Sequence, residues 1–235
     1  MMESKQTAMR QFLFLIRHGQ TTWNVEHRLP GQLPGIGLTD TGREQAKRLA
    51  EALAVLPLTA IISSPLERAV ETAKYLAQGR DLTIQLEPDL MDIELGRWSG
   101  QNRDELFKSD PVWAAFVRDP TEGPEGVETF PALERRVVAA VERWLKKEST
   151  GAYPAFVTHD DVIKVLIAHY IGLEVRRSRS LVIENASVSV VVLETDHQPR
   201  VLAMSWCPQP SWLQPFTLAA ERPKSEAQLV GDHDE

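Results

Sequence analysis

The amino-acid sequence predicts a three-layer α/β/α fold built on an open, mostly parallel sheet with an antiparallel edge strand. Short apolar segments at 11–16, 59–63 and 155–158 have the pattern of strands that are buried on both faces. Helical patterns alternate with these segments, which is typical of a parallel sheet. The chain has 235 residues, 43% of them apolar, which is enough for one generous domain, and we place that domain at residues 11–206.

The first third of the chain holds one loop and two helices between its strands. Prolines and glycines predict the loop over 24–38. Thr41 and Glu44 have the spacing of a capping box, which predicts a helix that continues to about residue 55. Just past the second strand, the sequence Ser64-Pro65-Leu66-Glu67 predicts a helix with Ser64 as its capping residue.

The middle of the chain, residues 88–130, is predicted to contain only short helices because prolines interrupt it. We expect this segment to be an insertion, or lid, over the active face of the sheet. A short strand at 83–86 precedes it. Trp98 and Trp113 fit two interpretations equally well, since tryptophans in such a segment either line a substrate pocket or pack in the interior.

The last third resumes the alternation of strand and helix. Apolar periodicity predicts one helix over 131–147 and another over 163–171 that ends at Gly172. Two segments rich in β-branched residues, 187–193 and 200–205, are expected to pair as an antiparallel hairpin. Residues 207–235 are rich in proline and charged side chains, which predicts a loosely ordered tail.

Charge and composition exclude several classes of function. The formal net charge of −7 offers a polyanion no overall attraction, so we expect no nucleic-acid partner. Cys207 is the single cysteine, which favours a reducing compartment. The apolar run at 12–16 is too short to span a bilayer or to form a signal-peptide core. These features predict a cytoplasmic protein without a membrane partner, and they leave its oligomeric state open.

Basic side chains follow three of the predicted strands. Arg17 and His18 come directly after the first strand, Arg68 lies one helical turn past the second, and His159 follows the strand at 155–158. The carboxyl ends of parallel strands face one crevice, so these groups are expected to meet there. Guanidinium groups match phosphate oxygens, and imidazole is a competent nucleophile near neutral pH. The pattern predicts a site for a phosphorylated small molecule.

Four motifs in order carry a resemblance to a known family: LIRHGQTTWN, SSPLERAVETA, LMDIELGRWSG and VTHDDVIK. Together they resemble the histidine phosphatase superfamily, the phosphoglycerate-mutase-like group, and its phosphatase members most of all. The resemblance implies a metal-independent phosphatase that hydrolyses small phosphate monoesters and needs no cofactor. It also implies that His18 carries the phosphoryl group in a covalent phosphohistidine intermediate. The remaining roles that it implies fall on the phosphate-binding residues Arg17, Thr21, Asn24, Arg68 and His159.

Two positions depart from the family pattern. The family usually has glutamate as its general acid, four residues before a glycine, and here that position holds Asp92, with Glu94 as the alternative. Asp160 follows the second histidine, where the family commonly has glycine. A carboxylate beside a bound dianion would repel it, so we expect the Asp160 side chain to turn away while its backbone stays near the substrate.

Other interpretations of these residues stay open at this point. His159-Asp160-Asp161 also has the composition of a hydrolytic metal site. Arg17 and Arg68 could instead form surface salt bridges with Glu44 or Glu67. A phosphoglycerate mutase would use the same pocket, but mutases that resemble this family carry a longer basic insertion where this chain has the acidic stretch RDPTEGPEGVETF. A phosphate-binding module without catalysis is the third alternative.

Overall fold

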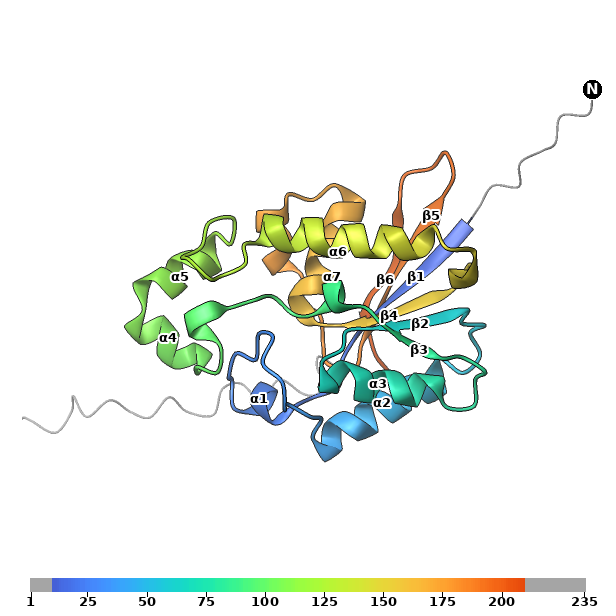
Figure 1. Ribbon diagram of the computed structural model, residues 1–235, viewed down its shortest axis with the longest axis horizontal. Helices are drawn as coiled ribbons and strands as arrows, with labels where there is room; N and C mark the ends of the chain where they lie inside the picture. The colour runs from blue at the N-terminus through green and yellow to red at the C-terminus, as the bar shows by residue number, and fades with distance from the viewer. Residues whose placement is uncertain (1–9, 210–235) are drawn as a thin grey trace, which may run out of the picture.

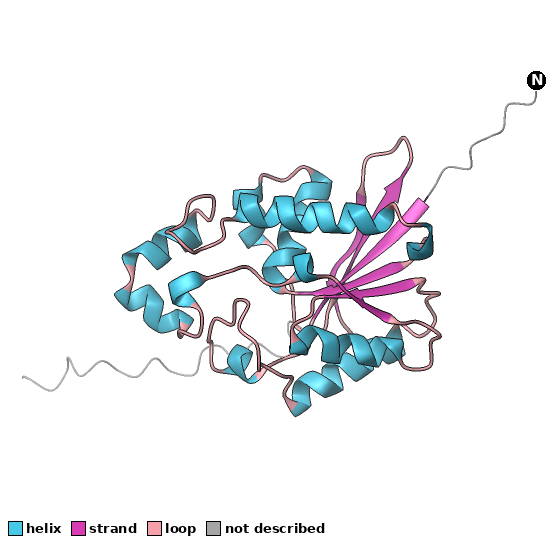
Figure 2. Cartoon of the chain, in the orientation of Figure 1, coloured by secondary structure: helices cyan, strands magenta, loops and turns pink. Residues whose placement is uncertain are grey.

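The computed structural model describes residues 10–209, and these form a six-stranded sheet flanked by helices (Figures 1 and 2). The strand order is β3-β2-β4-β1-β5-β6. The first four strands in that order run parallel, whereas β5 runs antiparallel to β1 and β6 antiparallel to β5. The predicted mixed sheet is therefore confirmed. The strands are β1 (Arg10–Arg17), β2 (Ala60–Ser63), β3 (Ile84–Leu86), β4 (Pro154–Thr158), β5 (Val188–Glu194) and β6 (Arg200–Trp206).

Helices cover both faces of the sheet. In Figure 1, α2 and α3 lie on one side of the strands, and α6 and α7 lie on the other. Short 3₁₀ turns occur at Pro88–Leu90, Gly96–Trp98, Glu148–Thr150 and Val175–Ser180. The α-helices are α1 (Thr22–Val25), α2 (Asp40–Ala52), α3 (Glu67–Ala77), α4 (Arg103–Ser109), α5 (Pro111–Arg118), α6 (Phe130–Leu145) and α7 (Asp160–Ile171).

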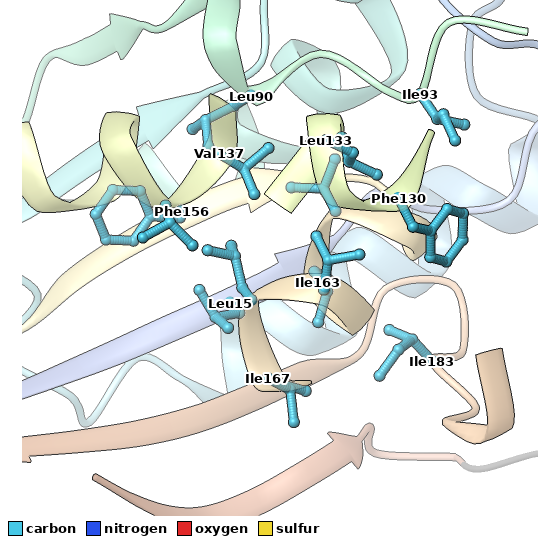
Figure 3. Close-up of a cluster of buried hydrophobic side chains, with 14 of the residues drawn as sticks. Leu15, Leu90, Ile93, Phe130, Leu133, Val137, Phe156, Ile163, Ile167 and Ile183 are labelled. Carbon is cyan, nitrogen blue, oxygen red and sulfur yellow. The ribbon is translucent and has the colours of Figure 1, made fainter. Parts of the chain in front are cut away.

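The central strands are apolar throughout because both of their faces are buried. Along β1, Leu13 and Leu15 point into a cluster with α6 and α7, whereas Phe14 and Ile16 point into a cluster with α2 and α3. Successive residues of a strand face opposite sides, so a strand with a helix layer on each side has no polar face. Figure 3 shows the first cluster, in which Leu15 lies among side chains of the other elements that surround it.

Helix α2 begins earlier than its capping pattern predicts, and α3 begins later than its pattern predicts. Thr39, not Thr41, caps α2: its Oγ1 accepts a hydrogen bond from the backbone N–H of Gly42 at 3.0 Å. Ser64 does not cap α3, which begins at Glu67 without a side-chain cap. The Ser64 hydroxyl instead lies 2.9 Å from Nε2 of His159. Both predictions were wrong: Thr39 takes the cap position two residues before Thr41. The Ser64 hydroxyl contacts His159 and accepts from the backbone N–H of Leu66 at 3.3 Å, before the helix begins.

The segment 88–130 contains short helices, as predicted, and its α4 and α5 project away from the sheet (Figure 1). Its aromatic residues pack on one another within the same cluster that α6, α7 and one face of the sheet form. Trp98 and Trp113 are buried, with ring centroids 5.0 Å apart, and Phe116 packs 5.3 Å from Trp98. The structure therefore selects the packing interpretation of both tryptophans. A lid function for this segment stays a prediction.

The prediction for the tail at 207–235 falls outside the described residues except at 207–209. Cys207 is buried at this end of the described chain. None of the helices within residues 10–209 is long and apolar enough to cross a membrane.

A close approach between two backbone segments places the start of α2 against the loop that follows β1. A Cβ atom on Gly42 would lie 2.0 Å from the backbone oxygen of Gln20, which no real structure tolerates. We expect Gly42→Ala to lower the free energy of unfolding by about 1–3 kcal/mol in a denaturant titration, because the backbone must move. Gly37→Ala is the control, since its nearest atom lies at 3.8 Å. Equal effects of the two substitutions would contradict this account.

Candidate active site

The three strand ends that the sequence pointed to are neighbours in the sheet. β2, β4 and β1 lie side by side and parallel, so the residues after them share one edge. His18 follows β1 directly and His159 follows β4, and their ring centroids lie 5.3 Å apart. Arg68 reaches the same place from the first turn of α3. The expected meeting of the two histidines and the arginine is confirmed as geometry.

His18 is held as a neutral imidazole with a defined tautomer. Its side chain is buried, and its Nδ1 lies 2.7 Å from the backbone oxygen of Gly19. A carbonyl oxygen only accepts hydrogen bonds, so Nδ1 carries the proton and Nε2 carries the lone pair. Burial, and then the positive charges of Arg68 and Arg17, lower the pKa of His18 well below its usual value. The Nε2 lone pair is therefore available at neutral pH.

Two arginines carry donors that have no acceptor among the described residues. Arg68 is completely buried, and its Nη2 donates to the backbone oxygen of Gly31 at 2.8 Å. Its Nε and Nη1 are buried without a hydrogen-bond partner, as is Nε of Arg17. Arg17 also donates through Nη1 to the backbone oxygen of Ile183. Buried donors without partners are costly in a native protein, which indicates a site shaped for an anion.

The salt-bridge alternative for these arginines is not what the structure shows. Glu44 pairs with Arg48 at 2.7 Å, on the exposed face of α2. Arg68 pairs with Asp92 at 3.4 Å inside the site. Glu67 uses its carboxylate to accept from the backbone N–H of Gly35 at 2.9 Å. Both arginines lie close enough to the histidines for their charges to lower the pKa values of His18 and His159, after the larger effect of burial.

His159 is buried completely and is also neutral. Burial is the largest cause that lowers the pKa of His159 well below its usual value, followed by the charge of Arg68. Its Nε2 lies 2.9 Å from the Ser64 hydroxyl, whereas its Nδ1 is buried without a hydrogen-bond partner, 3.7 Å from Oδ2 of Asp92. When the Ser64 hydroxyl donates to Nε2, the ring proton lies on Nδ1. That nitrogen then adds a further N–H donor to the site.

Asp92 reaches the site and Glu94 does not. The Asp92 carboxylate lies against Arg68 and His159, and its Oδ1 accepts from the backbone N–H of Ile93 at 2.9 Å. Glu94 directs Oε1 to the backbone N–H of Gly96 at 2.9 Å. Burial raises the pKa of Asp92 to about 6, against the opposing charge of Arg68. Of the two carboxyl groups, Asp92 is the one placed and tuned to exchange a proton near neutral pH.

The residues after His18 hold the loop beside the site. Thr21 is buried, and its Oγ1 accepts from the backbone N–H of Asn24 at 3.2 Å while its hydroxyl donates to Oδ1 of Asn24 at 3.0 Å. Asn185 donates to the same Oδ1 at 3.2 Å. Asn24 lines the cavity beside His18, whereas Thr21 is not among the lining residues. Substrate binding by Thr21 and Asn24 stays a prediction.

Asp160 starts α7 and lines the same cavity. Its Oδ2 is drawn to Lys164 at 2.7 Å, one turn along the helix, which offsets its negative charge. Its Oδ1 is buried without a hydrogen-bond partner. A direct role of Asp160 in binding substrate stays a prediction. Among residues 10–209, no group of three or more His, Cys, Asp or Glu side chains is arranged to hold a metal ion.

The cavity beside His18 and Asp92 is small, about 160 Å³, and two chain segments wall it, whereas Arg68 and His159 are not among its lining residues. One is the loop predicted at 24–38, and the other is the segment 88–130. The lining residues are Arg17, His18, Trp23, Asn24, His27, Arg28, Leu29, Pro30, Asp92, Ile93, Leu95, Arg103, Asp160 and Asp161. Most of the lining residues that the sequence did not indicate lie in loops, which neither periodicity nor a strand end marks, but Trp23 lies in α1 and Arg103 begins α4.

Ser64 is the clearest functional position that sequence reasoning missed. Its hydroxyl contacts His159 at 2.9 Å, yet its place before a proline and a glutamate favoured a capping role. The only feature that indicates a role for Ser64 in the site is its position at the end of β2, beside the end of β4. To recognise this feature, one must know that β2 and β4 are neighbours in the sheet.

An α/β fold with two neutral histidines and two arginines at its strand ends defines a phosphate-binding enzyme core. The sequence profile of the histidine phosphatase superfamily (branch 1) matches residues 13–206. The chain belongs to that superfamily, so the resemblance of its motifs is confirmed.

Relatives and solved structures agree on the family and carry different activities. The chain is 33% identical over 180 residues to a probable phosphoglycerate mutase, GpmB, of Enterobacter sp. (strain 638), covering 75% of this chain and 82% of the relative. It superposes on a putative alpha-ribazole-5'-P phosphatase from Escherichia coli with a TM-score of 0.73 and 28% identity, covering 85% and 99% of the two chains. A mycobacterial glucosyl-3-phosphoglycerate phosphatase, solved with VO3, gives a TM-score of 0.74 and 28% identity, covering 83% and 98%.

The pKa of Asp92 can be tested by removing a neighbouring charge. Burial is the main cause of its rise, and the negative charge of Asp161 adds to it. We expect Asp161→Asn to lower the pKa of Asp92 from about 6, because the ionised carboxylate then loses a repulsive neighbour. A carbon-detected NMR titration of the carboxyl group measures the value. Asp104→Asn, at an exposed site, is the control, and a pKa that rises in Asp161→Asn contradicts the assignment.

Proposed function

We propose that this protein is a metal-independent phosphatase that hydrolyses small phosphate monoesters through a phosphohistidine on His18. One observation carries the proposal. The lone pair of a neutral His18 Nε2 lies beside two arginines that retain buried donors without partners. Attack on phosphorus requires neutralisation of the equatorial oxygens, and these donors supply it.

In the first step, His18 attacks phosphorus in line with the bridging oxygen. The Nε2–P bond forms as the P–O bond to the leaving group breaks. Asp92 gives its proton to the departing oxygen, which leaves as an alcohol, and Asp92 becomes a carboxylate. Arg17, Arg68 and the Nδ1 proton of His159 hold the phosphoryl oxygens. The hydrogen bond from His18 Nδ1 to Gly19 orients the ring throughout.

In the second step, water attacks the phosphorus of phosphohistidine. The Asp92 carboxylate takes a proton from that water, the new O–P bond forms, and the P–Nε2 bond breaks. Inorganic phosphate leaves, and the lone pair returns to Nε2. A carboxyl group with a pKa of about 6 is suited to both directions of proton transfer, because neither of its states is strongly favoured near neutral pH.

A phosphoglycerate mutase is the second candidate, since the curated relatives that match are named probable phosphoglycerate mutases. A mutase must return the phosphoryl group to a second anionic substrate and exclude water. The acidic stretch 118–130, with Arg118 as its one basic residue, argues against a second anion site there. A coupled assay that interconverts 2- and 3-phosphoglycerate separates the two activities, and mutase turnover faster than phosphate release favours this second candidate.

His18→Ala tests the nucleophile. We expect it to abolish release of p-nitrophenol from p-nitrophenyl phosphate, because the N–P bond can no longer form. The wild-type protein, quenched in alkali after mixing with a ³²P-labelled monoester, is expected to retain acid-labile label that His18→Ala lacks. EDTA is expected to change neither result.

Unchanged turnover in His18→Ala would overturn the proposal. Tight binding of vanadate without turnover of any monoester would favour the alternative of a phosphate-binding module without catalysis.

Asp92→Asn tests the general acid through the leaving group. We expect kcat/KM for an alkyl phosphate to fall about 10²–10⁴-fold, because an alkoxide needs the proton. The fall should be much smaller for p-nitrophenyl phosphate, whose leaving group is stable as an anion. With the alkyl phosphate, wild-type kcat/KM should decline as the pH rises through about 6, where Asp92 loses its proton. Asp92→Asn should lack that decline, and Glu94→Gln is the control that should keep it.

A further inference from the structure

One arginine of α6, Arg136, binds the backbone of the segment that carries Asp92. Arg136 donates through Nη1 to the backbone oxygens of Asp89 and Met91, at 2.8 and 3.0 Å. It donates through Nη2 to the backbone oxygen of Asp92 itself, at 3.2 Å. Three carbonyl groups in four consecutive residues therefore bind the same planar guanidinium group.

The remaining donors of Arg136 bind a carboxylate. Nε donates to Oε1 of Glu128 at 2.9 Å and Nη2 to Oε2 at 2.7 Å, which is a two-point contact. A guanidinium group has five N–H donors, and these contacts use all of them. Both side chains are largely buried, with 20% of Arg136 and 14% of Glu128 exposed. A saturated, buried guanidinium group has one low-energy orientation, so it acts as a rigid clamp.

The same pair also holds the chain just past Asp92. The Glu128 carboxylate accepts from the backbone N–H of Glu94 at 3.3 Å, and the Glu128 N–H donates to the backbone oxygen of Glu94 at 2.8 Å. On the other side, Gln32 donates to the backbone oxygen of Asp92 at 2.9 Å. The backbone on both sides of the carboxyl group is thus tied to α6 and to the loop after α1.

We propose that Arg136 is a positioning residue for proton transfer by Asp92. Aspartate has a single methylene between backbone and carboxyl group, so a shift of its backbone moves the carboxyl group by nearly the same amount. A misplacement of about 1 Å at a reacting group can lower a rate about 100-fold. Arg136 does not touch the reacting atoms, and it acts by keeping Asp92 within reach of the bridging oxygen. This inference rests on the proposed role of Asp92 as general acid.

The test compares Arg136→Met with Arg143→Met on two substrates. Arg143 lies on the same helix and pairs with the side chains of Glu87 and Asp89, but it donates to no carbonyl group of the Asp92 segment. We expect Arg136→Met to lower kcat/KM for an alkyl phosphate up to about 100-fold and to affect p-nitrophenyl phosphate much less. Arg143→Met should leave the ratio between the substrates unchanged. Equal losses on both substrates in Arg136→Met would mean that the clamp supports folding only, and would overturn the inference.

A double-mutant cycle with Asp92→Asn provides the second measurement. If Arg136 acts through Asp92, then Arg136→Met should cost little further alkyl phosphatase activity once the carboxyl group is gone. Full additivity of the two losses would overturn the inference. Arg136→Lys keeps the charge but cannot bind three carbonyls and a carboxylate at once, so we expect it to lose most of the same activity. Full activity in Arg136→Lys would also overturn the inference, and this variant guards against an Arg136→Met that fails to fold.

These outcomes are distinguishable from a failure of the proposed function. If His18→Ala keeps full turnover, or Asp92→Asn spares the alkyl phosphate, the assigned chemistry is wrong. If His18→Ala abolishes turnover and Asp92→Asn loses activity mainly on the alkyl phosphate, as expected, and Arg136→Met changes both substrates equally, only the positioning role is wrong.

Discussion

The site depends on a positive charge that is buried completely in the interior. Removal of a guanidinium group from water costs several kcal/mol unless partners compensate. Arg68 has Gly31 and Asp92 as its partners, and two of its nitrogens retain no acceptor among the described residues. Burial is the largest cause of the lowered pKa values of His18 and His159 and of the raised pKa of Asp92, and the charge of Arg68 is the next largest influence on each, lowering all three. One buried arginine thus acts on the protonation of three neighbours.

The sheet makes this arrangement possible because it brings three strand ends to one edge. β4 lies between β1 and β2, although it comes more than 90 residues after β2 in the chain. Helix layers on both faces bury the strands and give the edge a rigid base. The proposed general acid is the exception, since Asp92 lies in an irregular segment after β3. Such a segment has no ladder of hydrogen bonds to hold it, and the contacts of Arg136, Glu128 and Gln32 take that place.

The placement of charge also reconciles an acidic protein with an anionic substrate. The formal net charge of −7 is a sum over the whole chain, and charges at exposed positions are screened by water and salt. Arg68 is completely buried and Arg17 is partly buried, so their charges are screened less. The carboxylates of Asp160 and Asp161 face Lys164, which offsets them at the cavity wall. The proposed phosphate ester would therefore meet a local field that the overall charge does not describe.

The sequence by itself determined the layered fold, the hairpin edge and the meeting of His18, Arg68 and His159, because strand burial, helix periodicity and strand ends are local patterns. It also indicated Asp92 through its motif. It was wrong about Thr41 and Ser64 as caps, and it left Trp98 and Trp113 undecided. Only the tertiary structure decided those points, together with the direction of Glu94, the contact of Ser64 with His159 and the clamp of Arg136. The contacts of Ser64 and Arg136 and the burial of the two tryptophans depend on groups that are distant in the sequence and approach one another only once the chain is folded.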